Sequence, residues 1–178
     1  MSVIGAYAPQ SEDPSCAYAR SHFWTSLHNL LRRLPFRSLR LLLIDANAHV
    51  EHSPPVVGPC GSDVCNSNGH SRLHLCHSHD IMLTNTWRPG LSSEWTWQST
   101  DKKTRKKIDF IGWSRVYKKC IACNVGVDLS LRFSLLSFMD HRPVSLLVRV
   151  PTVSEHCNRF VSPPSCPRPL VSIDRANL

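Results

Sequence analysis

The sequence lacks an apolar run long enough to cross a membrane, and it lacks a recognisable secretion signal. Its most apolar run, residues 41–44, is far shorter than the ~18 residues that a membrane-spanning segment needs, and Asp45 ends it. The N-terminus has no basic segment followed by an apolar one. These absences argue against a membrane protein and favour a soluble, intracellular one, nuclear or cytoplasmic.

Acidic residues are scarce relative to basic ones: 13 Asp and Glu stand against 21 Lys and Arg, for a formal charge of +8. A field of this sign attracts polyanions, and nucleic acid is the commonest such partner of a basic domain. A basic solvated surface without a partner explains the charge equally well, so the charge needs support from motifs. Eight cysteines are present, but without a secretion signal they do not indicate a disulfide framework.

The apolar pattern predicts one α/β domain over residues 1–150 and a separate tail. Large apolar residues recur at three- and four-residue spacing over residues 16–34, which indicates a helix that Pro35 ends. A second, shorter helix is predicted over residues 72–78. Apolar or alternating runs predict strands over residues 2–8, 39–44, 81–85, 94–98, 107–113 and 144–150. Prolines at 163, 164, 167 and 169 make residues 151–178 resemble a flexible linker.

Two loops between these elements bear on function. Residues 51–68 are rich in Pro, Gly, Ser and Asn, and a loop of this length in a compact domain is usually functional, so it could lie over a substrate. A turn at residues 101–102 should join the strands on either side of it into a hairpin. Trp95 and Trp97 alternate with polar residues in that hairpin, as half-buried strand residues do.

A basic run at the hairpin turn is the candidate DNA-binding element, and it consists of Lys102, Lys103, Arg105, Lys106 and Lys107. Charge at the rim of a nuclease cleft contacts phosphates without reading the base sequence. A solvated turn is the alternative, and the sequence leaves it open.

Three aspartates stand at the ends of apolar runs or within them. Asp45 follows one strand-like run, Asp109 lies inside another, and Asp140 is followed at once by His141. A carboxylate at a strand end is held rigidly near the rim of a sheet, where α/β enzymes gather metals and ligands. Each aspartate alone is more often a cap or a turn residue. Together with Asn47 and His141, they describe an oxygen-rich site suited to Mg²⁺ (or Mn²⁺) and to phosphodiester hydrolysis.

Five motifs occur in the order seen in the endonuclease/exonuclease/phosphatase superfamily. They are GAYAP at 5–9, IDANA at 44–48, SNG at 67–69 with LTNT at 83–86, TW at 96–97 with TRKKIDFI at 104–111, and DHRPV at 140–144. Over about residues 2–150 the chain most closely resembles the endonuclease domains of non-LTR retrotransposons and proteins derived from them, among which craniofacial development protein 2-like proteins are typical. The resemblance implies a two-sheet α/β sandwich with mixed, mainly antiparallel strands and flanking helices. It also implies a metal-dependent endonuclease activity on DNA.

The resemblance further implies roles for five residues. Tyr7 would contact the scissile phosphate. Asp45 and Asn47 would position the attacking water and the phosphate, with Asp45 also close to the metal. Asp109 would orient His141, which would hydrogen-bond a phosphate oxygen.

Other positions carry weaker signals. Asp140 resembles a metal ligand. Asn85 would contact DNA and Asn68 also matches a motif, although a cap or turn asparagine explains either one. Met139 stands where serine usually precedes the Asp-His pair, which would remove a hydrogen bond that steadies Asp140.

The resemblance covers only the C-terminal portion of the superfamily domain. We therefore expect an incomplete sandwich without an early asparagine and without the glutamate that is the principal metal ligand, so that Mg²⁺ would bind weakly. An uncovered apolar sheet face would invite aggregation or a protein partner that covers it. Residues 172–178 resemble the start of a link to a reverse transcriptase.

Two other interpretations stay open. Neither of them, nor the endonuclease interpretation, requires a small-molecule cofactor. The chain can be a catalytically dead fragment that binds only DNA or a protein. It can also be a zinc-binding interaction module, although the spacing of its candidate ligands matches no common structural-zinc pattern. Those ligands are Cys60, Cys65, His70, His74, Cys76, His77, His79, Cys120 and Cys123.

Overall fold

The computed structural model describes all residues except 12, 36, 63, 88–94, 128–139 and 150–178, and it describes the backbone alone for 122–127. Met139 and the tail from 151 onward therefore lie outside the described residues. In chain order the elements are β1 (Ser2–Tyr7), η1 (Pro14–Cys16), α1 (Ala17–Arg33), β2 (Arg40–Asp45), α2 (Ser67–His79), β3 (Ile81–Leu83), η2 (Thr84–Thr86), β4 (Trp97–Gln98), β5 (Arg105–Lys106), β6 (Asp109–Ser114), η4 (Arg115–Cys120), β7 (Ile121–Val127) and β8 (Val144–Val148).

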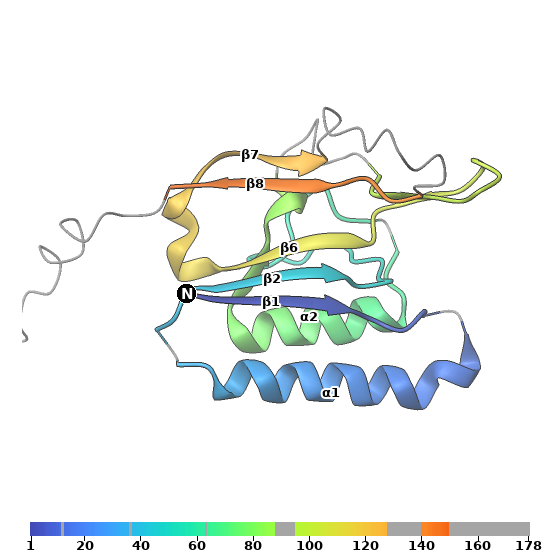
Figure 1. The fold of residues 1–178 in the computed structure, drawn as a ribbon, viewed down its shortest axis with the longest axis horizontal. Helices are drawn as coiled ribbons and strands as arrows, with labels where there is room; N and C mark the ends of the chain where they lie inside the picture. The colour runs from blue at the N-terminus through green and yellow to red at the C-terminus, as the bar shows by residue number, and fades with distance from the viewer. Residues whose placement is uncertain (12, 36, 63, 88–94, 128–139, 150–178) are drawn as a thin grey trace, which may run out of the picture.

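Four strands form the central sheet, in the order β1-β2-β6-β3 (Figure 1). β1 runs parallel to β2, whereas β6 is antiparallel to both β2 and β3. Helices α1 and α2 lie on one side of these strands and the antiparallel pair β7–β8 lies on the other (Figure 1). This is the mixed, mainly antiparallel α/β arrangement that the sequence predicts. Within the described ranges, none of the helices combines the length and apolar character needed to span a membrane.

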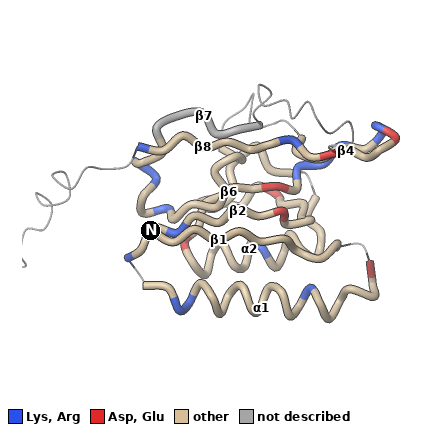
Figure 2. The backbone as a smooth tube through the Cα atoms, in the orientation of Figure 1, with Lys and Arg blue, Asp and Glu red and all other residues tan. Residues whose placement is uncertain are grey.

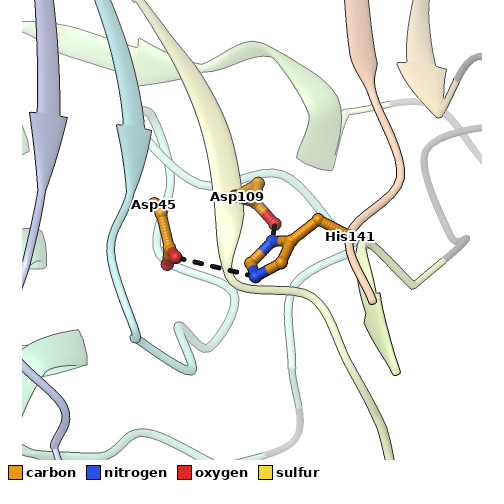
Figure 3. Close-up of side chains that lie close together, drawn as sticks. All are labelled: Asp45, Asp109 and His141. Atoms are coloured by element: carbon orange, nitrogen blue, oxygen red, sulfur yellow. Dashed lines mark hydrogen bonds and ion pairs between the residues drawn. The ribbon is translucent and has the colours of Figure 1, made fainter. Parts of the chain in front are cut away.

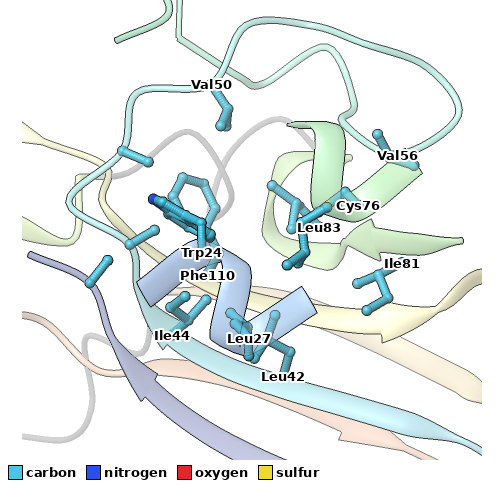
Figure 4. Packing of buried hydrophobic residues seen from close by; sticks show 14 of the residues in the cluster. Trp24, Leu27, Leu42, Ile44, Val50, Val56, Cys76, Ile81, Leu83 and Phe110 are labelled. Carbon is cyan, nitrogen blue, oxygen red and sulfur yellow. The ribbon is translucent and has the colours of Figure 1, made fainter. Parts of the chain in front are cut away.

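The hydrophobic core lies between the central sheet and the two helices (Figure 4). Leu42 and Ile44 alternate along β2 and are both buried in this core, because successive residues of a strand face opposite sides. From α1, Trp24, Leu27 and Leu31 recur at helical spacing and fill the same cluster. Full burial of each such side chain stabilises the fold by roughly 1.5–3 kcal/mol.

The opposite face of β1 and β2 exposes apolar side chains. Val3 is 55% exposed and Leu43 is 42% exposed. Exposed apolar surface on a sheet favours association with other apolar surface. The expectation that a protein partner covers this face stays a prediction.

Helix α2 begins earlier than the helix predicted from the sequence and includes residues that resemble a loop. Its N-cap is Asn66, whose side-chain oxygen accepts a hydrogen bond from the Gly69 N–H. The helix ends at Asp80, which adopts the left-handed conformation with a φ of 52°. The capped first turn accommodates Ser, Asn and Gly, which compete with helix formation when no cap is present.

Three other elements differ in extent from those predicted. The run at 81–85 is a strand only over β3, and its last residues belong to the 3₁₀ turn η2. The hairpin forms between β4 and β5, which pairs Trp97 with Lys106, and β6 joins the central sheet instead. β7 is not among the predicted strands, because it contains asparagine and glycine, which disfavour strands until a partner such as β8 pairs with them.

Candidate active site

Asp45, Asp109 and His141 come together at one end of the central sheet (Figure 3). Asp45 is the last residue of β2 and Asp109 is the first residue of β6, and the antiparallel register pairs them directly. His141 lies on the segment that forms an isolated bridge with Trp97. One ligand atom from each of the three side chains lies within 4.8 Å of the others. The three groups are therefore close enough to act on a single phosphate.

A hydrogen bond to Asp109 orients the His141 imidazole. His141 Nδ1 lies 3.0 Å from Asp109 Oδ2, and since an ionised carboxylate only accepts, Nδ1 carries the proton. His141 Nε2 faces Asp45, whose Oδ2 lies 4.0 Å away. The His141 side chain is 35% exposed, so Nε2 is accessible from the pocket. An aspartate placed in this way fixes the imidazole and stabilises a positive charge on it.

Two buried polar side chains fix the strand that carries Asp109. The Thr96 hydroxyl oxygen accepts hydrogen bonds from the Ile108 and Asp109 N–H groups, at 3.0 and 3.1 Å. The Asn85 side-chain nitrogen donates to the Asp109 carbonyl at 2.9 Å, and its oxygen accepts from the Ile111 N–H at 3.3 Å. Asn85 is 2% exposed and its amide is used inside the fold, so the structure gives it a framework role, and its contact with DNA stays a prediction.

Asn47 holds the turn that follows Asp45. The Asn47 N–H donates to Asp45 Oδ1 at 3.0 Å, and the Asn47 side-chain nitrogen donates to the Ala8 carbonyl at 2.8 Å. Asn47 has a φ of 42°, in the left-handed region that asparagine tolerates better than most residues. An asparagine at position 47 therefore suits the left-handed turn whose N–H group orients the Asp45 carboxylate.

Asn68 links the loops beneath the pocket to the helices. Its side-chain nitrogen donates to the carbonyls of Pro9 (2.7 Å), Ala46 (3.2 Å) and Asn47 (3.3 Å). Its side-chain oxygen accepts a hydrogen bond from the Trp24 indole N–H at 3.0 Å. Asn68 is 1% exposed, so these bonds replace all contact with water. Asn68 therefore acts as a positioning residue for the turn that carries Asp45 and Asn47.

A pocket opens above Asp45 and His141, and predicted site residues line it. Tyr7 ends β1 beside Asp45 in the β1–β2 register and is 65% exposed. Asp140 is exposed, and its Oδ2 accepts a hydrogen bond from the Trp97 indole N–H at 2.9 Å. The lining also includes Asn47, His49, Asn66 and Lys106.

The basic run predicted to contact DNA lies on the β4–β5 hairpin (Figure 2). Its exposed members are Lys102, Lys103 and Arg105. Lys106 lines the pocket, so the run reaches the site itself. Lys107 is partly buried and its ammonium group donates to the Cys60 carbonyl at 3.0 Å, which ties the hairpin to the loop after β2.

Cations cover the two indole rings of the hairpin region, and both rings are half buried as predicted. The Arg142 guanidinium carbon lies 3.3 Å from the centre of the Trp95 ring, and that of Arg105 lies 5.1 Å from it. The Lys106 ammonium lies 5.9 Å from the centre of a Trp97 ring. Such contacts hold positive charge in place near the pocket.

Burial raises the pKa of Asp45 above its ordinary value, and the negative charge of Asp109 adds to the rise. The hydrogen bond from the Asn47 N–H and the positive charges of His141 and Arg72 oppose it. A carboxylate with a raised pKa is a stronger base than an ordinary aspartate, and it can exchange a proton with water more readily.

Replacing Asp45 with asparagine should raise the stability of the fold at neutral pH. Because the folded-state pKa of Asp45 is raised, its contribution to stability is present below the unfolded-state pKa and is lost as the pH rises through the folded-state value. Asparagine avoids that loss and keeps an oxygen that can accept from the Asn47 N–H. Urea unfolding at about pH 7 and about pH 3 should therefore show a gain for Asp45→Asn only at the higher pH.

Asp101→Asn is the matched control, because a hydrogen bond from the Ser99 hydroxyl lowers the pKa of Asp101. Its contribution to stability is present above the unfolded-state pKa and is lost as the pH falls through the folded-state value. The control should therefore lose stability at neutral pH where Asp45→Asn gains it. An Asp45→Asn chain that is less stable at neutral pH would contradict the burial argument.

The pocket fits a divalent cation held by few protein ligands. Asp45 and Asp140 both line it, and Mg²⁺ is usually held by one or two carboxylates together with waters and substrate phosphates. Asp109 Oδ2 is already engaged by His141. In the described part of the chain, Asp45, Asp109 and His141 form the one group of three or more acidic, His or Cys residues whose ligand atoms all lie within 4.8 Å of one another.

The cysteines and histidines of the zinc-module interpretation come from the loop after β2, from α2, from η4 and from β7. Cys76 is buried, and burial raises the pKa of its thiol to about 11, which disfavours the thiolate that binds zinc. His77 Nε2 lies 3.0 Å from the Ser53 hydroxyl oxygen. Among the described residues, no three of the candidate ligands bring their atoms within 4.8 Å of one another.

Comparison with known proteins supports the fold. No family model matches the chain, and no curated protein sequence matches it. A similar solved structure is that of the 3' phosphatase NExo from Neisseria bound to a product DNA hairpin, with a TM-score of 0.57. The two chains are 17% identical, and the match covers 83% of this chain and 61% of that one. The chain thus has the endonuclease/exonuclease/phosphatase type of fold and spans less than two thirds of the length of that structure.

Proposed function

We propose that this chain is a DNA phosphodiester hydrolase domain of the retrotransposon endonuclease type, dependent on Mg²⁺ or Mn²⁺. The observation that carries the proposal is the Asp109–His141 pair, which faces Asp45 across 4.0 Å in a pocket that Lys106 also lines. The similar structure is described as a phosphatase with bound DNA, and the motifs of this sequence agree with that chemistry.

In this mechanism one side chain accepts a proton from water, and others bind the phosphate. Asp45 takes a proton from the attacking water, and Asn47 holds the turn that aims the Asp45 carboxylate. With a proton on both ring nitrogens, His141 donates a hydrogen bond from Nε2 to a phosphate oxygen, and Asp109 stabilises the positive charge that this form of the ring carries. Tyr7, exposed at the edge of the pocket, contacts the same phosphate.

Asp45 and Asp140 are the residues that would hold the cation, which when bound neutralises charge on the phosphate. Mg²⁺ gives up its waters reluctantly, and two carboxylates outside the Asp109–His141 pair are a small ligand set. We therefore expect weak metal binding and slow catalysis by this chain.

A supercoiled-plasmid nicking assay with Mg²⁺ or Mn²⁺ tests the proposal. Slow nicking that stops on addition of EDTA and in the Asp45→Ala variant is the expected result. Nicking that survives EDTA and the substitution would contradict it, because neither the cation nor the Asp45 carboxylate would then take part.

DNA binding without hydrolysis is the second candidate function, and the exposed cations of the β4–β5 hairpin favour it. With Lys102, Lys103, Arg105 and Lys106 on phosphates, four contacts would make the affinity for duplex DNA fall by ~100-fold between about 50 and 200 mM salt, because each neutralised phosphate releases counterions. Fluorescence anisotropy with a short duplex measures this slope.

Replacing Lys102, Lys103 and Arg105 together with alanine should flatten that slope, since three of the contacts are removed. Lys118→Ala with Lys119→Ala is the matched control: both side chains are exposed on η4, which lies at the opposite end of the strands from the hairpin (Figure 1). An equal loss of affinity in the two variants would show that DNA does not bind preferentially at the β4–β5 hairpin.

A further inference from the structure

A histidine cluster lies between α1 and α2, on the side of the sheet away from β7 and β8 (Figure 1). His28 comes from α1, whereas His74 and His79 come from α2. His28 Nδ1 and His79 Nε2 are 3.1 Å apart, and the centres of the two rings are 4.6 Å apart. The His74 ring stacks near His28, with 6.2 Å between the ring centres. The mechanism proposed above uses none of these residues.

The spacing of His28 and His79 matches two nitrogen ligands on one metal ion. Zinc–nitrogen bonds of ~2.0–2.1 Å at a tetrahedral angle place two ligand nitrogens ~3.3 Å apart. A hydrogen bond between the rings gives a similar distance, with one ring as the donor. A metal ion would take the place of the proton shared by the two rings, and the two nitrogens would stay at a similar distance from each other.

His74 offers the third imidazole, and its ring is exposed. The ligand atoms of His28, His74 and His79 do not all lie within 4.8 Å of one another, so the His74 ring must turn toward the pair to bind the same ion. A groove between the helices, lined by His28, His70, His74 and Ser71, gives solvent access to two of the three proposed ligands, His28 and His74. Water can then fill a fourth position, as it does in zinc sites with three protein ligands.

The cluster suits a borderline transition ion and not Mg²⁺, because imidazole nitrogens and not carboxylates face one another. A ring nitrogen binds a metal only when it is unprotonated, and the 3.1 Å hydrogen bond between His28 Nδ1 and His79 Nε2 requires that one of these two nitrogens be an unprotonated acceptor. The positive charges of Arg40 and Arg32 act on the His79 ring and oppose a cation, so affinity on the order of micromolar is expected rather than nanomolar.

The geometry points to a second metal site, separate from the active-site pocket, in which His28, His79 and His74 bind a Zn²⁺-class ion and clamp α1 to α2. An ion held by both helices binds the folded state and not the unfolded chain. Occupancy therefore raises the melting temperature.

The experiment measures the melting temperature of the full chain with Zn²⁺ and with EDTA. All chains carry Asp45→Asn and His141→Gln, so that the active-site carboxylate and imidazole do not supply the zinc signal. Zinc at about 100 times its Kd should raise the melting temperature of this background by ~5–10 °C. His28→Gln should abolish the rise, and the matched control His22→Gln, which alters an exposed histidine of the same helix, should keep it.

His74→Gln keeps the test decisive if His28→Gln unfolds the chain, because His74 is exposed and its removal leaves the core intact. It should weaken Zn²⁺ binding by at least ~10-fold in calorimetric titration. Spectra of the Co²⁺-loaded background should show the intense visible bands of a tetrahedral ion, and His79→Gln should remove them. Equal zinc affinity in the background, His28→Gln and His74→Gln chains would overturn the assignment.

Discussion

Replacing His141 with alanine should slow the nicking of supercoiled DNA by ~10²–10⁴-fold, the range in which a positioned acid or base contributes. Asp109 holds His141 Nδ1 at 3.0 Å, while His141 Nε2 faces Asp45. Alanine removes both the donor to the phosphate and the partner that Asp109 stabilises. The rate is measured under Mn²⁺ at high protein concentration, where slow turnover can be followed.

Two further variants separate chemistry from folding. Asp109→Asn keeps an oxygen that can accept from His141 Nδ1 but loses the negative charge, so its rate should fall between those of the unmodified chain and His141→Ala. His52→Ala, which alters an exposed histidine, is the matched control and should nick at the unmodified rate. A His141→Ala chain that melts normally and nicks like the control would remove His141 from the mechanism.

The sequence places Asp45 and Asp109 on strands because Asp45 follows a short apolar run and Asp109 interrupts another, and short runs of this kind favour strands. The antiparallel register of β2 and β6 then brings them directly opposite one another. His141 was accessible only through its place in a motif, since no periodicity of the chain indicates a segment that crosses to Trp97. The pairing of distant segments is what short-range patterns do not encode.

The supports of the site were largely invisible in the sequence. Thr96 accepts hydrogen bonds from two consecutive N–H groups at the start of the strand that carries Asp109, a role that its place in the TW motif at 96–97 does not by itself indicate. Asn85 and Asn68 match motifs, yet their burial and bonding make them parts of the framework. A single sequence identifies residue types able to do chemistry more readily than the buried amides that hold them.

Replacing Gly69 with alanine should destabilise the fold by ~2–4 kcal/mol and slow catalysis as well. A Cβ at this position would lie 1.9 Å from the His49 carbonyl oxygen and 2.7 Å from Cys65 Sγ. The nearer atom belongs to the backbone, so α2 or the loop after β2 must move. The better helix propensity of alanine, worth about 1 kcal/mol, is too small to offset that movement.

The movement should reach the active site through Asn66, the N-cap of α2. Its side-chain oxygen accepts from the Gly69 and His49 N–H groups at 2.8 and 3.1 Å, and its nitrogen donates to the Asn47 carbonyl at 3.2 Å. Gly5→Ala is the matched control, because nothing lies within 4 Å of a Cβ added there. Urea unfolding and the nicking rate should both change in Gly69→Ala and stay unchanged in Gly5→Ala. A Gly69→Ala chain as stable as the control would show that α2 does not press against the loop that positions Asp45.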